Sequence, residues 1–204
     1  MPRRWQRRGA QCGGNVISKT DTPTLAVAPV SSTGRRVFAI AIGALVVAVA
    51  AQVRIPLPIT PVPVTLQDLA VLTVGGLLGP VAGVAALITY LGLGIAGLPV
   101  FSGGASGMPW LLGPTGGYLL AFPVAALVMG AVARHGGFSR AFLGAFLGML
   151  IIHAGGVAQL AILSGDPVAA FEIGSLPFLP MGIIKVALAA ALVTRISPKL
   201  AKLL

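Results

Sequence analysis

The sequence predicts an all-α membrane protein with six transmembrane helices and both termini in the cytoplasm. Of its 204 residues, 56% are hydrophobic and 9% are charged, whereas soluble domains carry about 25% charged residues. So few charges cannot cover a water-facing surface. Apolar runs bounded by proline, glycine and charged residues recur six times. The basic residues gather between alternate runs, a pattern typical of transmembrane topology.

The first 34 residues predict a disordered, basic cytoplasmic tail, and residues 35–204 predict one transmembrane domain. The tail mixes arginine with serine, threonine, proline and glycine and has no apolar period. We expect it to meet anionic lipids rather than nucleic acid. The only cysteine, Cys12, lies there, so neither an intrachain disulfide nor a metal site is predicted. Arg35 and Arg36 could also open a twin-arginine signal peptide, but five more apolar segments favour a first transmembrane helix.

Six apolar segments are predicted to be helices, and a glycine-rich loop separates the third from the fourth. The helices are expected at Val37–Val53, Val64–Leu78, Val81–Ala96, Gly116–Ala133, Ala141–Leu163 and Pro177–Ile196, and the loop at Gly97–Gly113. Gly79-Pro80 divides the second helix from the third because these residues interrupt helices. Several segments are shorter than the ~20 residues that cross a bilayer squarely. We therefore expect the second and third helices to be short, broken or shielded by neighbours.

The distribution of charge gives the predicted orientation. With the N-terminus inside, 12 of the 14 lysines and arginines fall in cytoplasmic segments. Arg54 is then the only cation of the outer segments, which also hold Asp166 and Glu172, and Lys185 lies within the last helix. The opposite orientation would invert the positive-inside rule at every loop.

A few polar residues interrupt the apolar segments and predict a ligand pocket near the outer face. Lys185 is the main candidate, because an ammonium group in a bilayer costs ~2.5–3.5 kcal/mol and usually marks a functional site. Gln67, Asp68 and Tyr118 start two helices that enter from the same side, so we expect all four at similar depth. Alternatively, Lys185 snorkels to the interface, Gln67 and Asp68 cap a helix, and Tyr118 is an interfacial anchor.

Other candidates are the loop glycines, Gln159 and two alanines of the first helix. Gly103 and Gly104 could bring backbone N–H groups close to a ligand, because no Cβ stands in the way. Gln159 lies near the outer end of its helix and is a secondary pocket candidate. Ala44 and Ala48 form a small-xxx-small pair, which suits packing within the chain or docking of a partner.

A different class of function is an intramembrane serine protease. Ser106 lies in a Gly-x-Ser-Gly string, and His153 is followed two residues later by Gly155-Gly156. A Ser/His dyad on a six-helix scaffold resembles rhomboid-type proteases. The string is common by chance in a chain with 28 glycines, and the serine is predicted outside while the histidine is mid-membrane. A packed, hydrogen-bonded histidine is the simpler interpretation.

Several proline- and glycine-rich strings occur in order along the chain. They are Ile59-Thr60-Pro61-Val62-Pro63-Val64-Thr65-Leu66-Gln67, Gly79-Pro80, Gly97-Leu98-Pro99-Val100-Phe101-Ser102-Gly103-Gly104, Gly113-Pro114-Thr115-Gly116-Gly117-Tyr118 and Pro177-Phe178-Leu179-Pro180. Together the strings resemble the BioY family, the biotin-binding membrane subunits (S components) of energy-coupling factor (ECF) transporters. The resemblance runs from about residue 37 to residue 196 and leaves out the tail.

The resemblance implies an S-component fold that binds biotin at the outer face of the bacterial plasma membrane and mediates its uptake. It implies a transmembrane coupling subunit and two ATPase subunits as partners, or sometimes transport without them, and neither an enzyme nor a cofactor. The sequence contains no Gly-x-x-x-x-Gly-Lys-Ser/Thr string, so ATP hydrolysis would come from those partners. An S component for another vitamin is the alternative within this class.

The resemblance also assigns roles to single residues. Lys185 matches the lysine of the last helix and is expected to pair with the carboxylate of biotin. The family usually has an acid three residues before this lysine, but Gly182 stands there. Asp68 is the only acid predicted within a span, so we expect it near Lys185 as a substitute. Ala44 and Ala48 would lie where the family meets its coupling subunit.

Overall fold

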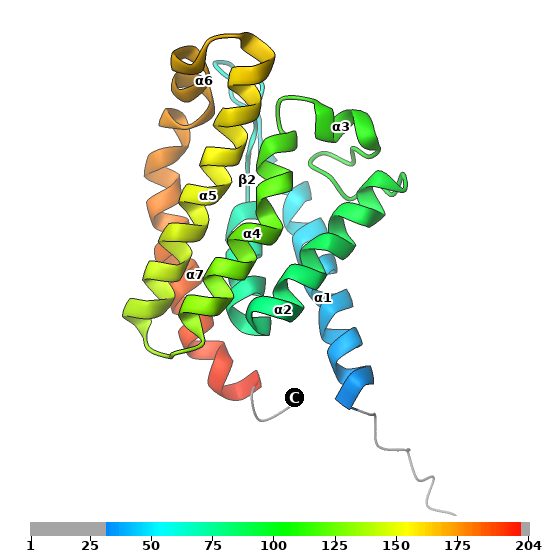
Figure 1. Cartoon of the computed structure of the whole chain (residues 1–204), viewed down its shortest axis with the longest axis vertical. Helices are drawn as coiled ribbons and strands as arrows, with labels where there is room; N and C mark the ends of the chain where they lie inside the picture. Colours follow the sequence, from blue (N-terminus) through cyan, green and yellow to red (C-terminus); the bar gives the residue numbers. More distant parts are fainter. Residues whose placement is uncertain (1–31, 201–204) are drawn as a thin grey trace, which may run out of the picture.

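The computed structural model describes residues 32–200, which form a bundle of helices joined by short loops (Figure 1). In chain order the elements are α1 (Ser32–Gln52), β1 (Arg54–Ile55), β2 (Val64–Thr65), α2 (Gln67–Ile95), α3 (Met108–Leu112), α4 (Gly116–Ala133), α5 (Phe138–Ser164), α6 (Pro167–Gly174), the 3-10 turn η1 (Leu176–Phe178) and α7 (Leu179–Leu200). Cys12 and the predicted tail up to residue 31 lie outside the described residues. The first helix begins before the predicted domain boundary at residue 35.

The long helix α2 is folded back on itself at Gly79. This residue has φ 78° and ψ 179° inside the helix, and Pro80 follows it. A methyl group added to Gly83 would lie 3.0 Å from the Cα atom of Gly75, although eight residues span ~12 Å of a straight helix. The two arms of α2 therefore cross closely, which confirms the predicted division at Gly79-Pro80.

The apolar segments confirm the predicted all-α membrane fold. Five helical segments of the described chain are long and apolar enough to span a membrane: Thr33–Gln52, Gln67–Ile95, Gly116–Ala133, Phe138–Ser164 and Pro167–Pro198. Since α2 supplies two arms, the bundle contains six apolar helical arms. Large apolar side chains point outward on these helices, for example Phe38, Leu120 and Leu150, as expected for a surface that faces lipid.

Small residues bring α2, α4 and α5 close together. A methyl group on Gly75 would lie 2.7 Å from the Cα atom of Ala126 on α4. One on Gly117 would collide with the carbonyl oxygen of Gly155 on α5. Such contacts allow van der Waals packing of helix backbones, which drives helix association in lipid. The tight centre fixes the upper ends of α4 and α5 around the site described below.

Four elements, two short strands and two short helices, are absent from the sequence prediction. The strands β1 and β2 pair antiparallel, with Arg54 opposite Thr65. The helix α3 interrupts the predicted loop. The helix α6 begins because Asp166 caps it, accepting hydrogen bonds from the backbone N–H groups of Val168 (2.9 Å) and Ala169 (3.1 Å). An aspartate before a proline is a known start signal for helices, and it was not used in the prediction.

The predicted last helix is displaced, because the structure starts α7 at Leu179 and ends it at Leu200 rather than over Pro177–Ile196. Pro177 falls instead in η1, a short turn between α6 and α7. A proline is tolerated at the start of a helical turn because its missing N–H group would have no partner there. The turn η1 therefore belongs to the connection between α6 and α7, and its Phe178 lines the cavity described below.

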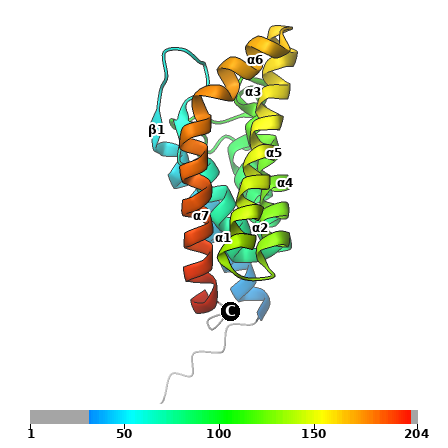
Figure 2. The ribbon, with the colours of Figure 1, turned by 90° about the vertical axis from the view of Figure 1, so that its left-hand side faces the viewer.

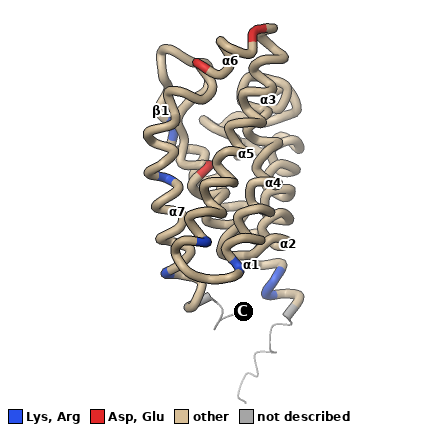
Figure 3. Tube along the Cα trace, turned by 60° about the vertical axis from the view of Figure 1, so that its left-hand side comes forward, with Lys and Arg blue, Asp and Glu red and all other residues tan. Residues whose placement is uncertain are grey.

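Acidic and basic residues lie at opposite ends of the bundle. The first residues of α1 and the last of α7 lie at the same end (Figures 1 and 2). Most of the basic residues gather at that end, and the acids outside the bundle centre lie beside α6 at the other (Figure 3). The fold thus separates the charges as the sequence predicts.

We propose that the basic end faces the cytoplasm, as the positive-inside rule predicts. Reporter proteins fused after Leu204 and after Gly165, which follows α5 at the far end, should then report opposite sides of the membrane. The fusion after Leu204 should be cytoplasmic. Reporters on the same side would contradict the fold between these positions, and an external Leu204 would contradict the orientation.

Candidate ligand-binding site

A cavity of about 70 Å³ lies in the half of the bundle that carries α3 and α6. Aromatic side chains make much of its wall: Trp110, Tyr118, Phe122 and Phe178. Its polar lining comes from separate parts of the chain: Thr65, Gln67, Asp68, Ser102, His153 and Lys185. An apolar enclosure with a few convergent polar groups is the usual form of a small-molecule site.

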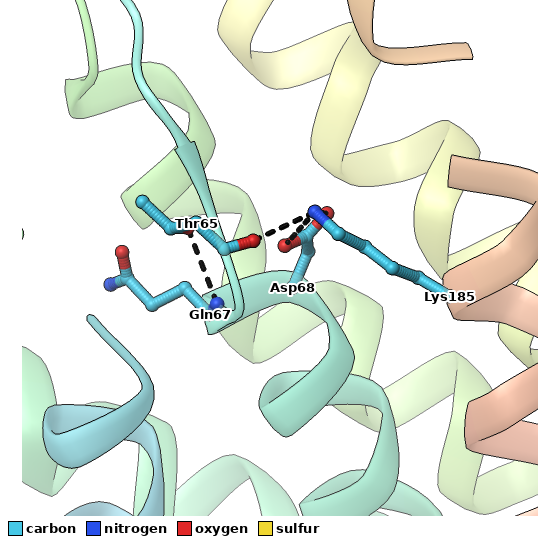
Figure 4. Close-up of polar contacts among 4 residues, drawn as sticks. All are labelled: Thr65, Gln67, Asp68 and Lys185. Atoms are coloured by element: carbon cyan, nitrogen blue, oxygen red, sulfur yellow. Dashed lines mark hydrogen bonds and ion pairs between the residues drawn. The ribbon is translucent and has the colours of Figure 1, made fainter. Parts of the chain in front are cut away.

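Lys185 and Asp68 form a buried ion pair in the wall of this cavity (Figure 4). The Nζ atom of Lys185 lies 2.9 Å from each carboxylate oxygen of Asp68 and donates a third hydrogen bond, of 2.7 Å, to the carbonyl oxygen of Thr65. Lys185 is only 5% exposed. The predicted proximity of Asp68 and Lys185 is confirmed.

Local structure explains how these groups meet. β2 ends at Thr65 and α2 begins at Gln67, so the carbonyl oxygen of Thr65 is left outside the helix and the first turn of α2 presents Asp68 beside it. At Gly182 a Cβ atom would face Met149 of α5 at 4.0 Å. Gly182 leaves that position without a carboxylate, and Asp68 of α2 approaches the ammonium group instead.

The ion pair carries no net charge but offers both hydrogen-bond donors and acceptors. An ammonium group has three donors, and Lys185 uses them on three oxygen atoms. Removing one partner of such a pair leaves an uncompensated buried charge, which costs ~3–5 kcal/mol. The pair is therefore stable in the empty cavity, and a ligand must share its hydrogen bonds rather than supply a missing counter-charge.

Gln67 and Tyr118 line the cavity, but their polar tips bond to the protein itself. The Nε2 atom of Gln67 donates to the hydroxyl of Tyr90 (2.6 Å), which donates to the carbonyl of Val100 (3.2 Å). In Figure 4 the side chain of Gln67 points away from Lys185. The hydroxyl of Tyr118 donates to the carbonyl of Gly174 (2.5 Å). Both residues shape the cavity and hold its loops.

Gly103, Gly104 and Gln159 are not among the residues that line the cavity. The N–H group of Gly104 donates to Oε1 of Gln52 (3.0 Å). The Nε2 atom of Gln159 donates to the carbonyls of Leu111 (2.9 Å) and Gly113 (2.6 Å), so it anchors the segment before α4 to α5. Direct contact of these three residues with a ligand stays a prediction, and their observed bonds support the frame of the site.

Several lining residues were missed by sequence reasoning. Ser102 and Trp110 lie in or beside the glycine-rich loop, where only the glycines were considered. His153 was interpreted as a packed group, and it does contact the rings of Tyr118 and Phe178, yet it also lines the cavity. Polar side chains are rare in the apolar segments of this chain. This rarity could have singled out His153 as it singled out Lys185.

Ala44 and Ala48, which were predicted either to pack within the chain or to meet a partner, pack within the chain in this structure. Ala44 is 2% exposed, and Ala48 packs against the same buried cluster. The packing of α1 on α2 covers Ala44, and contact of these two alanines with a partner stays a prediction. The outward face of α1 carries larger residues, including Leu45 and Val49.

Comparisons with known proteins agree with this geometry. The model of the BioY family matches residues 23–202. A probable biotin transporter BioY of Pyrococcus horikoshii is 36% identical over 162 residues, 79% of this chain and 96% of the relative. The biotin transporter BioY of Thermotoga maritima is 38% identical over 143 residues, 70% of this chain and 85% of the relative. A crystal structure of the S component for biotin from an ECF-type ABC transporter matches with a TM-score of 0.75 and 26% identity, covering 80% of this chain and 91% of that one.

These findings exclude the protease interpretation. The matched family and relatives are transporters. In the structure Ser106 is exposed, and the ring of His153 meets the hydroxyl of Ser175 at 3.5 Å. Because the family model matches most of the chain, and relatives named BioY are more than 30% identical to it over most of its length, this protein belongs to the BioY family.

Proposed function

We propose that this chain binds biotin in the cavity and mediates its uptake as the S component of an ECF transporter in the bacterial plasma membrane. The observation that carries the proposal is the buried Lys185–Asp68 pair in an aromatic cavity of a BioY-family chain. Relatives named as biotin transporters favour biotin over another vitamin.

The chemistry of biotin suits this lining. Its bicyclic ring combines a cyclic urea with a thioether ring, and an apolar chain leads to a carboxylate. The walls formed by Trp110, Phe122 and Phe178 can pack on the rings and the chain. The buried polar groups can then fix the orientation of the ligand, because a polar group left unpaired in such a site is costly.

In this geometry, Lys185 is expected to hold a different end of biotin from the one that the sequence predicted. Sequence reasoning paired Lys185 with the carboxylate. In the structure Asp68 already neutralises the ammonium group, so a second carboxylate would leave a net negative charge in a buried site. A cyclic urea has no charge and offers a carbonyl acceptor to Lys185 and an N–H donor to Asp68. We therefore assign the urea end of biotin to this pair.

The proposed partners are a transmembrane coupling subunit and two ATPase subunits, with membrane lipids around the bundle. The solved relative is an S component of an ECF-type ABC transporter, and this chain has no phosphate-binding loop of its own. The outward face of α1 is a suitable docking surface, because α1 packs on α2 by one face and leaves the other apolar and open.

The detergent-purified chain should bind biotin and should not bind thiamine or riboflavin. Isothermal titration calorimetry of each vitamin measures this directly. A folded sample that gives no biotin binding would refute the proposed function, and tighter binding of another vitamin would move the chain to a different substrate.

Replacing Lys185 by Met should weaken biotin binding by about 2–5 kcal/mol, the cost of truncating one partner of a buried, hydrogen-bonded charge pair. Affinity should be measured for biotin, for biotin amide, which lacks the carboxylate charge, and for 2-iminobiotin, whose ring is a guanidinium. If Lys185 bonds to the urea, Lys185→Met should weaken the binding of biotin and of biotin amide equally. Binding of iminobiotin should weaken less, because removal of the ammonium group relieves its repulsion with the guanidinium of the ligand.

Two other patterns would contradict this assignment. If Lys185→Met weakened the binding of biotin and iminobiotin but not of biotin amide, Lys185 would be the partner of the carboxylate. Equal losses for all three ligands would make Lys185 a structural residue. The thermal stability of Lys185→Met, compared with Asp68→Asn, reports how far each variant disturbs the fold.

Bulky residues on the outward face of α1 should block docking of the coupling subunit. Leu45→Trp combined with Val49→Trp should abolish co-purification of this chain with that subunit while biotin binding is unchanged. Leu150→Trp, at a similarly exposed position of α5 (49% against 57% for Leu45), is the matched control. Unchanged complex formation in the α1 variant would assign this face to lipid alone.

A further inference from the structure

A second cavity, of about 360 Å³, lies at the basic end of the bundle, and we call it the basic-end cavity. Three parts of the chain meet around it: the bend of α2 at Gly79, the loop of residues 134–137 between α4 and α5, and the last turns of α7. Figure 1 shows these segments together at the end where α1 begins and α7 ends. The volume far exceeds the ~30 Å³ that one water molecule takes up, so a group of several heavy atoms fits.

Glycines at two turns of the backbone keep this cavity open. Gly79, Gly136 and Gly137 line it, and their φ angles are 78°, 78° and 82°, which favour glycine. A methyl group added to any of the three would meet no atom within 4 Å. The turns therefore require glycine for their conformation, while no described side chain fills the space beside them.

The lining combines an apolar wall with a polar rim. Leu77, Ala141 and Val193 contribute apolar surface. Arg134, the residue that follows α4, and Ser197, near the end of α7, contribute polar groups. The loop from Arg134 onward is exposed, so the cavity opens to the surface there. Such a lining suits a ligand that has both a polar and an apolar part.

The guanidinium group of Arg134 has no counter-charge among the described residues. The single ion pair of residues 32–200 joins Lys185 and Asp68, and the other described acids lie beside α6 at the opposite end of the bundle (Figure 3). Within the same residues, the side chain of Arg134 makes one hydrogen bond, from Nε to Nε2 of His135 (3.3 Å). A guanidinium has five N–H donors, so both Nη groups of Arg134 remain available to an anion.

Further positive charge surrounds the basic-end cavity. The exposed Arg140 and Arg195 are next in the chain to the lining residues Ala141 and Thr194. The long helix α5 begins after Gly137 without a side-chain cap, so the positive end of its dipole adds to the field. An anion is therefore favoured in this cavity over a cation or a neutral group.

We propose that the basic-end cavity binds the phosphate headgroup of an anionic phospholipid and that Arg134 is its main contact. Arginine pairs with phosphate through two parallel N–H···O bonds, and basic pockets between transmembrane helices bind lipid headgroups. The glycine-lined space receives the headgroup, and the apolar wall meets the acyl chains, which a free phosphate lacks. A bound lipid bridges α2, the loop and α7, and thereby stabilises this end of the bundle.

Dioctanoyl phosphatidylglycerol should bind the detergent-purified chain and raise its unfolding temperature, whereas dioctanoyl phosphatidylcholine at the same concentration should not. Native mass spectrometry counts the bound lipids. Arg134→Gln should weaken phosphatidylglycerol binding about five-fold, the contribution of one basic residue near an anionic lipid. Arg36→Gln removes an exposed cation at the same end that does not line the cavity, and should change the affinity less than about two-fold.

Ser197→Phe should abolish phosphatidylglycerol binding, because the larger side chain fills the cavity without a change of charge. Thermal unfolding of each empty variant verifies its fold. Equal binding of the two lipids, or equal losses in Arg134→Gln and Arg36→Gln, would assign the effect to the general charge of this end and overturn the inference. Displacement of the lipid by inorganic phosphate at equal concentration would exclude a lipid site, and wild-type binding in Ser197→Phe would exclude this cavity. None of these measurements involves biotin, so their outcome is independent of the proposed function.

Discussion

The buried charge of Lys185 is the constraint on which the arrangement of the cavity-holding half of the bundle depends. An ammonium group in a membrane helix is costly unless it is paired and hydrogen-bonded. Asp68 and the carbonyl of Thr65 provide those partners, and both lie where β2 passes into α2. Satisfying this one charge therefore ties α7 to the start of α2 and fixes the wall between them.

The remaining polar side chains of this half mostly serve the backbone. Non-helical segments in a membrane protein need partners for their carbonyl groups, because lipid supplies none. Tyr118 bonds to Gly174, Gln159 to Leu111 and Gly113, and Tyr90 to Val100. These bonds hold the loops above the cavity in place. Few polar groups of the cavity lining are then left for a ligand, and the Lys185–Asp68 pair is the charged feature among them.

The sequence predicted those features that depend on residue type alone. The bend at Gly79 follows from the helix-breaking pair Gly79-Pro80. The separation of charge and the need of Lys185 for a counter-group follow from the cost of charge in lipid. The proximity of Asp68 was predictable because it was the only acid within a span. The hydrogen-bond partners of Gln67, Tyr118 and Gln159 could not be predicted, because they lie far away in the sequence. Gln67 bonds to the hydroxyl of Tyr90, and Tyr118 and Gln159 bond to backbone carbonyls. The burial of Ala44 depends on which face of α1 meets α2, and a nearly uniform apolar helix gives no signal for that.

Lys185 and Arg54 also illustrate two ways in which a chain can keep a cation beside a binding site. The buried lysine requires a counter-ion in the empty state, and the pairing with Asp68 removes its attraction for anions at a distance. The exposed arginine is solvated by water, so it needs no partner and keeps its long-range field. An anionic ligand arriving from outside is attracted by the second kind of cation and not by the first. The neutral pair in the cavity wall can therefore select a ligand group only by short-range hydrogen bonds, whereas the exposed arginine acts on charged molecules over a longer distance.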